Sequence, residues 1–444
     1  MKRIDFENGN IVSNILKAAL PMLVAQIMSL LYNIVDRVYI ARIPDVGTTA
    51  LGAVGLCFPI IVIITAFSNL FGTGGAPIFS IERGKGNHAK AGLLMNTSFT
   101  LLALCAVILM IAGLLFARPI LVLFGASDAG LAYAYPYLMI YLLGTFPSMA
   151  ATGMNPFINA QGYATTGMIS VIIGAITNLL LDPLFIFVFG LGIKGAAIAT
   201  VISQTLSAAF VLYFLHYKAE YRIRFLSKTE LASCSEDAKN IVSLGTAGFI
   251  MQLTSSLVTI CANNVLSVTG GDVYISVMTI ISSVRQMVET PIYAITEGSS
   301  PIISYNYGAG NAKRIRQTFK CMLAVSMTAL TVFWLFVQLS PTTFIRIFSN
   351  SEEIIATAGW TLRVYMAVFC MFSIQMSVQQ TFTALGKAKA SLFIACLRKI
   401  ILLIPLIFIL PHFFDNKVFA VFLAEPVSDT ISITASIITF RIVF

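Results

Sequence analysis

The chain has 444 residues, of which 58% are hydrophobic and only 11% are charged, and its mean hydropathy is +0.89. Soluble domains carry about 25% charged residues, so this composition excludes a water-soluble protein and predicts an integral membrane protein. The net charge of +9 would suit a nucleic-acid partner, but the distribution of the basic residues indicates membrane orientation and no nucleic acid.

Six apolar segments, each long enough to cross a bilayer as a helix, occupy the first half of the chain. They run over residues 14–41, 51–79, 93–117, 131–156, 165–189 and 193–216. After a polar stretch, six more follow at residues 241–268, 274–305, 318–339, 354–384, 390–411 and 417–440. The prediction is an all-α membrane protein of twelve transmembrane helices in two six-helix lobes, residues 1–216 and 241–444. Residues 217–240 are expected to form a cytoplasmic linker.

Lys and Arg residues predict the orientation of the spans, because they concentrate in cytoplasmic loops. Of the 28 Lys and Arg residues, four lie within the spans and six would face outward if the N-terminus is inside, which leaves 18 inside. The six outward residues are Arg37, Arg42, Arg118, Lys194, Arg346 and Lys417. Both termini of this multi-pass chain are therefore expected on the cytoplasmic side.

The second half repeats the first. "PIFSIERGKGN", residues 77–87, and "PIISYNYGAGN", residues 301–311, agree at six of eleven positions, whereas chance would give about one. The same offset of 224 residues pairs Ala160 with Ala384 and Gly162 with Gly386. Each half has an even number of spans, so the lobes are expected to be parallel, pseudo-symmetric repeats. Transporters built in this way bind substrate between the repeats and alternate its access.

Two acids lie within the spans of the first half, Asp36 and Asp182, and no base lies deep in that half. At 1.5 Å per residue, both acids are expected about 7–11 Å below the outer surface. Asn178, one turn before Asp182, and Thr200 lie at a matching depth. Four oxygen-bearing side chains would suit Na⁺, and two neighbouring carboxyl groups would also hold a proton near neutral pH. These residues do not decide whether Na⁺ or H⁺ is the coupling ion.

The second half carries four acids and four bases within its spans and is expected to neutralise itself. These residues are Arg285, Glu289, Glu297, Arg363, Arg398, Lys399, Glu425 and Asp429. The acidic surplus, and with it ion coupling, is therefore expected in the first half.

The twin G-x-G-N loops and the segments "YNIVDRVYIA" and "NLLLDPLFIF…GLGIKGAAIAT" resemble the multidrug and toxic compound extrusion (MATE) transporters. The bacterial MepA-like branch is the most similar, and the resemblance covers essentially the whole chain. It implies export of amphipathic, mostly cationic compounds driven by inward flow of H⁺ or Na⁺, without enzymatic activity or another cofactor. Since a two-lobed monomer is complete in itself, we expect a monomer among the lipids of the bacterial inner membrane.

The resemblance assigns the first-half ion site to Asp36, Asn155, Asn178, Asp182 and Thr200. A substrate cavity between the lobes is expected to include Gln26, Tyr32, Asn33, Asn159, Gln252 and Asn263. The alternative function is a flippase of lipid-linked precursors with the same two-lobe plan. A flippase for anionic head groups should expose unpaired bases along its cavity, and only Arg285 and Arg363 are deep enough.

Overall fold

The computed structural model describes residues 3–44 and 46–443, and this part of the chain is helical without any strand. The first bundle consists of α1 (Ile11–Ala41), α2 (Gly47–Gly84), α3 (His88–Leu123), α4 (Asp128–Leu143), α5 (Thr145–Ala160), α6 (Ala164–Pro183), η1 (Leu184–Val188), α7 (Gly192–Tyr213) and η2 (Phe214–Lys218). The second consists of α9 (Ser235–Thr269), α10 (Asp272–Gly308), α11 (Ala312–Leu339), α12 (Pro341–Ile345), α13 (Glu352–Tyr365), η3 (Phe369–Met371), α14 (Phe372–Ala384), α15 (Ala388–Cys396), η4 (Leu397–Leu403), α16 (Ile404–Ile409), η5 (Leu410–His412) and α17 (Lys417–Val443). The prediction of an all-α membrane fold in two lobes is confirmed.

Nine helices of the described residues are individually long and apolar enough to cross a bilayer. Two predicted spans are each broken into two helices. Residues 131–156 divide into α4 and α5 at Gly144, and residues 354–384 bend by 47° between α13 and α14. At the second break the carbonyl of Met366 accepts a hydrogen bond from Trp334 Nε1 at 2.7 Å, so a side chain replaces the missing helical donor.

Between the bundles, α8 (Lys228–Ser233) is a short helix within the predicted linker, and α9 already begins at Ser235. Ser227 caps α8 and forms a reciprocal capping box with Glu230. Arg224 Nη1 and Nη2 both donate to the Glu230 carboxylate, at 2.7 and 2.6 Å. This contact, together with the cap, lowers the pKa of Glu230 to about 2.

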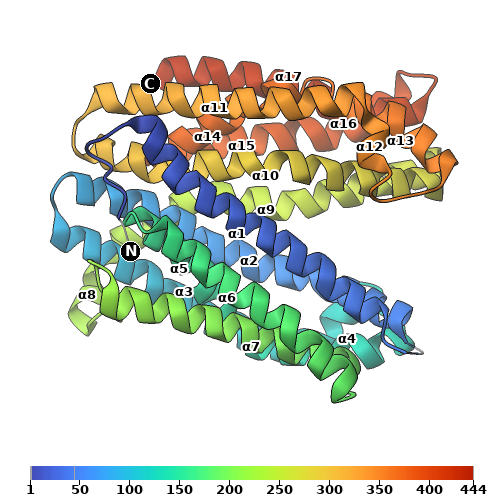
Figure 1. Ribbon diagram of the computed structural model, residues 1–444, viewed down its shortest axis with the longest axis horizontal. Helices are drawn as coiled ribbons and strands as arrows, with labels where there is room; N and C mark the ends of the chain where they lie inside the picture. Colours follow the sequence, from blue (N-terminus) through green and yellow to red (C-terminus); the bar gives the residue numbers. More distant parts are fainter. Residues whose placement is uncertain (1–2, 45, 444) are drawn as a thin grey trace.

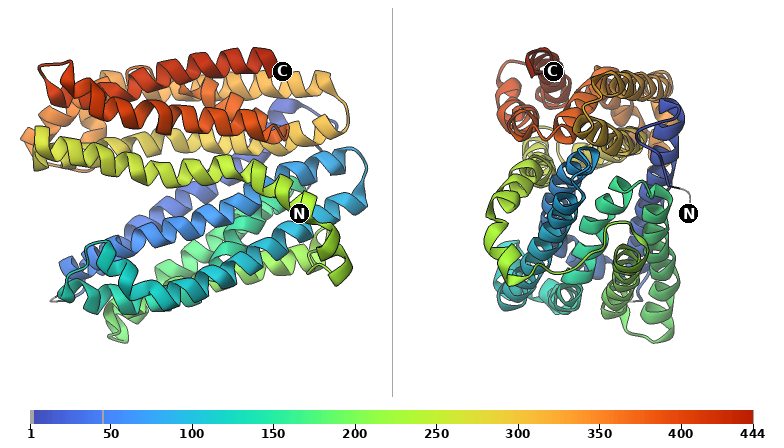
Figure 2. Two further views of the ribbon diagram at one scale, coloured as in Figure 1. Left: turned by 180° about the vertical axis from the view of Figure 1, so that it is seen from behind. Right: turned by 90° about the vertical axis from the view of Figure 1, so that its left-hand side faces the viewer.

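The two bundles converge at one end of the molecule and diverge toward the other (Figure 1). The same arrangement is seen from behind, and both termini lie at the converging end (Figure 2). We call this the basic end, because loops 85–87 and 309–311 lie there among basic residues. Those residues are Arg83, Lys85, Lys90, Lys313, Arg314 and Arg316.

The duplicated loops mark the place where the lobes touch. A Cβ atom added to Gly84 of α2 would lie 2.0 Å from the carbonyl oxygen of Tyr305 on α10. A Cβ atom added to Gly308 would lie 1.9 Å from the carbonyl oxygen of Ile81 on α2. Both pairs are related by the 224-residue offset, so the repeat produces one reciprocal backbone contact between α2 and α10. Only glycine permits this approach.

The turns that follow these glycines have the same geometry in both copies. Gly86 and Gly310 have φ values of +76° and +71°, which an L side chain rarely adopts. Asn87 then accepts from the backbone N–H of Lys90 at 3.2 Å, and Asn311 accepts from that of Arg314 at 3.0 Å. Each turn thus ends one helix and caps the next.

The segment before α1, residues 3–10, crosses from one lobe to the other at the basic end. We call it the N-terminal strap. On the first lobe, the N–H of Ile4 donates to the carbonyl of Gly162 at 3.0 Å, and Arg3 forms an ion pair with Glu220 at 2.8 Å. The ring of Phe6 is buried, and its neighbours include Arg83, whose guanidinium carbon lies 5.6 Å from the ring centre.

On the second lobe, three backbone carbonyls of the strap accept hydrogen bonds from a single guanidinium group. Arg314 donates to Phe6 at 3.0 Å, to Asn8 at 2.7 Å and to Gly9 at 3.3 Å. Asn306 adds a bond from Nδ2 to the carbonyl of Phe6 at 2.8 Å. The strap therefore connects the lobes through directional contacts in addition to the packing of α2 on α10.

Candidate functional site

Asp36 of α1 and Asp182 of α6 lie close enough for their carboxyl groups to interact directly. Asn178 Nδ2 donates to Asp182 Oδ1 at 3.1 Å and lies 3.4 Å from Thr200 Oγ1 on α7. Asp182, Asn178 and Thr200 are buried, and Asp36 is half-buried. Three helices thus bring four of the predicted site residues together.

Local sequence explains how α6 presents these groups. The spacing of four residues places Asn178 and Asp182 on one helix face. Pro183 follows directly and has no N–H, so the regular helix ends there and continues as the π-helical turn η1. Asp36 lies in the last two turns of α1, which ends at Ala41. Both acids are therefore near the end of the molecule opposite the basic end.

Three oxygen atoms at this site are buried without a hydrogen-bond donor: Asp36 Oδ1, Asp182 Oδ2 and Asn178 Oδ1. Among the described residues, no Lys, Arg or His forms an ion pair with either acid. Arg37 instead lies over the ring of Phe58, 5.5 Å from its centre. Two adjacent carboxyl groups without a base require a shared proton or a cation, and an all-oxygen set fits either.

Two tyrosines lie near the acids, and a third lies against both tyrosines. Tyr32, one turn before Asp36 on α1, is close to both acids and to Tyr141 of α4. Tyr137 is close to Asp36, and its ring stacks on that of Tyr141 at 6.4 Å between centres. Sequence reasoning missed Tyr137 and Tyr141, although their four-residue spacing in "YAYPYLMIY" places both on one face of α4.

Asn155 and Asn159 of α5 lie in a separate polar layer. Asn155 Nδ2 donates to the carbonyl of Gly167 at 3.0 Å and to Ser170 Oγ at 2.8 Å, and Asn159 Nδ2 donates to Asn155 Oδ1 at 3.1 Å. Ser170 precedes Asp182 by twelve residues on the same helix, or about 18 Å. The structure therefore does not bring Asn155 to the acid pair, and these amides instead hold α5 against α6.

One of the predicted cavity residues bridges the lobes. Gln26 Nε2 of α1 donates to Glu297 Oε2 of α10 at 3.2 Å. Asn33, seven residues further along the same face of α1, is exposed. Gln252 and Asn263 are half-buried, and their spacing of eleven residues places them on one face of α9.

The second lobe contains a buried ion-pair network of two bases and three acids. Arg285 donates to Glu425 and, at 2.6 Å, to Glu289. Arg398 donates to Glu425 at 2.8 Å and to Asp429 at 2.7 Å. The charges of this lobe therefore neutralise one another as expected only within this network of five residues.

Three charged residues of this lobe stand outside the network. Arg363 Nε donates to the backbone carbonyl of Gln338 at 3.1 Å. Lys399 Nζ donates to Ser255 Oγ and to the carbonyl of Met251. Glu297 contacts the first lobe through Gln26. The signs of these charges can be read from the sequence, but the helix faces on which the residues lie cannot.

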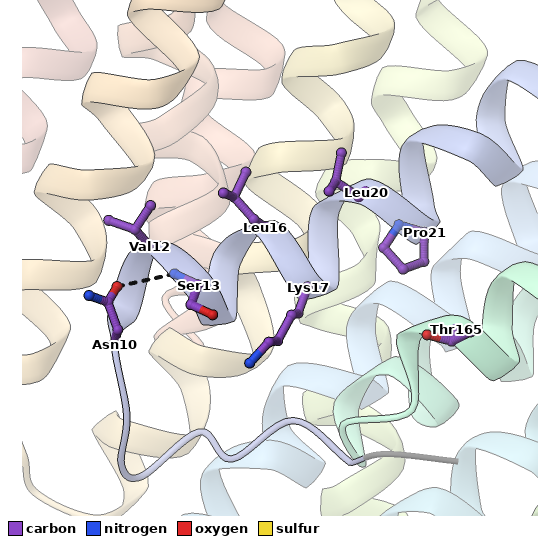
Figure 3. A pocket seen from close by; sticks show the side chains of 8 residues that line it. All are labelled: Asn10, Val12, Ser13, Leu16, Lys17, Leu20, Pro21 and Thr165. Carbon is purple, nitrogen blue, oxygen red and sulfur yellow. Dashed lines mark hydrogen bonds between the residues drawn. The ribbon is translucent and has the colours of Figure 1, made fainter.

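A recess of about 910 Å³ lies beside the first turns of α1, near the basic end (Figure 3). It is lined by Asn10, Val12, Ser13, Leu16, Lys17, Leu20, Pro21 and Thr165. None of the predicted cavity residues lines it. Its apolar side chains and single ammonium group lie on the exposed side of α1.

Two repeated lobes of long apolar helices, with an acid pair among the helices of one lobe, define the class of two-lobed membrane transporters. The sequence profile of the MatE family matches this chain twice, at residues 21–184 and 247–409, once in each half. The chain belongs to the MATE family of transporters.

Known proteins agree with this assignment. The multidrug export protein MepA of Staphylococcus haemolyticus is 25% identical over 427 residues, which cover 95% of this chain and 92% of that protein. MepA of Staphylococcus aureus strain N315 is 25% identical over 411 residues, covering 92% and 89% of the two chains. The expected similarity to the MepA-like branch is confirmed.

Solved structures share the fold at lower identity. An outward-facing conformation of a multidrug resistance MATE family transporter of the MOP superfamily has a TM-score of 0.90 at 21% identity. The alignment covers 100% of this chain and 98% of that one.

Proposed function

We propose that this chain exports amphipathic, mostly cationic compounds from a bacterial cell in antiport with H⁺ or Na⁺. Asp36 and Asp182, with Asn178 and Thr200, form the coupling site. The contact between the carboxyl groups of Asp36 and Asp182, which form no ion pair with a base in the described part of the chain, carries the proposal. The names of the MepA relatives, multidrug export proteins, support the export of drugs.

Coupling follows from the electrostatics of the acid pair. Without a proton or cation, the two carboxylates repel each other in a medium of low dielectric constant. Ion binding draws α1 toward α6 and α7, and ion release loosens the same contact. Drug binding between the lobes favours the ion-free arrangement, so each ligand weakens the binding of the other.

The basic end is proposed to face the cytoplasm, in accordance with the distribution of Lys and Arg. The lobes then meet on the cytoplasmic side and diverge toward the outside, as expected of a state that releases drug outward (Figure 1). The recess beside α1 would face the inner leaflet. Its leucines and Lys17 suit a lipid chain and an anionic head group.

The contacts of the bases weigh against a flippase for anionic head groups. Arg285 is bound to two acids, and Arg363 donates to a backbone carbonyl. Arg285 is thus neutralised within its own lobe, and no specific observation favours the alternative.

Proteoliposomes with separately imposed pH and Na⁺ gradients test the proposed function. Ethidium transport should be driven by an inward gradient of one of these ions and should stop when that gradient is collapsed. A rate of ethidium transport that depends on neither gradient would contradict antiport. Absence of ethidium transport under all gradients would contradict drug export.

A further inference from the structure

We propose that Glu297, with Tyr293 and Gln26, forms a binding site for monovalent organic cations between the two lobes. This inference rests on the proposed export function and assigns the residue that selects substrate charge. The site combines one carboxylate, one aromatic ring and one amide from helices α10 and α1.

Glu297 lies on the side of α10 that faces the first lobe. The adjacent Gly298 packs on α1 so closely that a Cβ atom would lie 2.9 Å from the backbone nitrogen of Ala19. Gly308, eleven residues or about three turns beyond Glu297, shares its face and packs on Ile81 of α2. Glu297 thus lies on the side of α10 that packs on α1 and α2, the two helices of the first lobe that make most of its contacts with α10.

The carboxylate of Glu297 has no basic partner. Gln26 donates to it at 3.2 Å, and no Lys, Arg or His in the described part of the chain forms an ion pair with it. Lys17 precedes Gln26 by nine residues, or two and a half turns, and therefore lies on the opposite face of α1. The other deep acids of this lobe, as far as the structure describes it, are bound to arginines, whereas Glu297 presents an uncompensated charge.

Part of this side chain is not covered by protein, although it lies far from either end of α10. Glu297 is exposed, and eleven residues, or about 16 Å of helix, separate it from the end of α10 at Gly308. An acid at this depth is costly unless a cation or water accompanies it. Exposure on the inter-lobe face gives a ligand access that the buried Asp182 does not offer.

The neighbouring ring defines the kind of cation. Tyr293, one turn before Glu297, lies on the same side of α10 and packs on the core of the second lobe, between the acids Glu289 and Glu297 of the same helix. An aromatic ring beside a carboxylate attracts alkylammonium and arylphosphonium cations through the ring face and through charge. A metal ion would instead require several oxygen ligands, as at the Asp36–Asp182 pair. We therefore assign organic cations to the Glu297 site and the coupling ion to the acid pair.

Equilibrium binding to the purified full-length protein tests the assignment. The probes are tetraphenylphosphonium and its neutral counterpart triphenylphosphine oxide. Glu297→Gln should weaken tetraphenylphosphonium binding about tenfold and leave the neutral compound within about twofold. Glu353→Gln, which neutralises an exposed acid at the start of α13, is the matched control and should change neither affinity.

A charge-exchange variant distinguishes loss of the binding site from misfolding of the protein. Gln26→Glu combined with Glu297→Gln moves the carboxylate from α10 to α1 across the same contact and should restore most of the cation affinity. Undiminished phosphonium binding in Glu297→Gln, or equal weakening of both probes, would overturn this site while leaving ion-driven export by the wild type intact. A wild type that binds no phosphonium would overturn the proposed substrate class and this site together.

Discussion

Asp36 presents an unpaired buried oxygen to the carboxyl group of a second acid, so its charge can be compensated only by a proton or a cation. Asp36→Asn retains the shape of the side chain and removes that charge. Drug accumulation against a gradient should fall about 5- to 150-fold, the range of typical allosteric coupling free energies. Efflux measured in cells at matched expression checks this, and undiminished efflux by a correctly folded variant would contradict it.

Sequence predicted the acid pair because carboxylates are rare within membrane spans and no base offsets Asp36 and Asp182. It misplaced Asn155, because distance along a helix does not reveal which neighbouring helix an amide contacts. Tyr137 and Tyr141 were missed because tyrosines are common in membrane helices and carry no charge signal. Glu297 was grouped with the charges of its own lobe, because sequence does not show which face of α10 turns toward α1.

At the scale of elements, the reciprocal contact between α2 and α10 depends on two glycines. Gly308→Ala would place a methyl group 1.9 Å from a backbone carbonyl oxygen, which side-chain rearrangement does not relieve. The contact should weaken by about 1–3 kcal/mol, as in other overpacked sites. Pulsed EPR distances between labels at exposed Lys228 and Lys313, in a cysteine-free background, should then broaden or lengthen.

Gly359→Ala is the matched control, since Gly359 also lies in a helix and no atom comes within 4 Å of an added Cβ. This variant should keep the wild-type distance. A Gly308→Ala protein whose distance distribution equals that of Gly359→Ala would show that the glycine contact does not hold the lobes together.

The N-terminal strap should stabilise the same closed arrangement. Arg314→Ala removes three charge-assisted hydrogen bonds to strap carbonyls. Because Arg314 is partly solvated, we expect a loss of about 1–2 kcal/mol in the lobe equilibrium rather than the sum of three bonds. Faster proteolysis of the strap and a larger population with separated lobes should follow, whereas Arg316→Ala, on an exposed position of α11, should leave both unchanged.

Helix positions were predicted well because uninterrupted hydrophobicity determines where a chain crosses a bilayer. The breaks were not predicted. Hydropathy does not change at Gly144 or near Met366, and each break lies against a residue of another helix, which hydropathy does not reveal. At Met366 this contact is the indole N–H of Trp334. Gly144 lies against Val201 of α7, whose side chain would be 2.8 Å from an added Cβ.

At the scale of the whole molecule, internal repetition in the sequence becomes contact symmetry in the structure. The 224-residue offset relates Gly84 to Gly308 and Ile81 to Tyr305, and these pairs form the two halves of one contact. The family profile also matches each half once. Two similar lobes that touch at one end can exchange that contact for another at the opposite end, which is the basis of alternating access.

The central claim is that the coupling ion and the drug compete through the Asp36–Asp182 pair. Equilibrium affinity for ethidium, measured from about pH 5.5 to 8.5 with and without Na⁺, tests it directly. If protons couple, affinity should rise with pH; if Na⁺ couples, affinity should fall as Na⁺ is added. Drug should weaken ion binding by the same factor, and Asp182→Asn should abolish the dependence. An affinity that is flat across both series in the wild type, and unchanged in Asp182→Asn, would contradict the account.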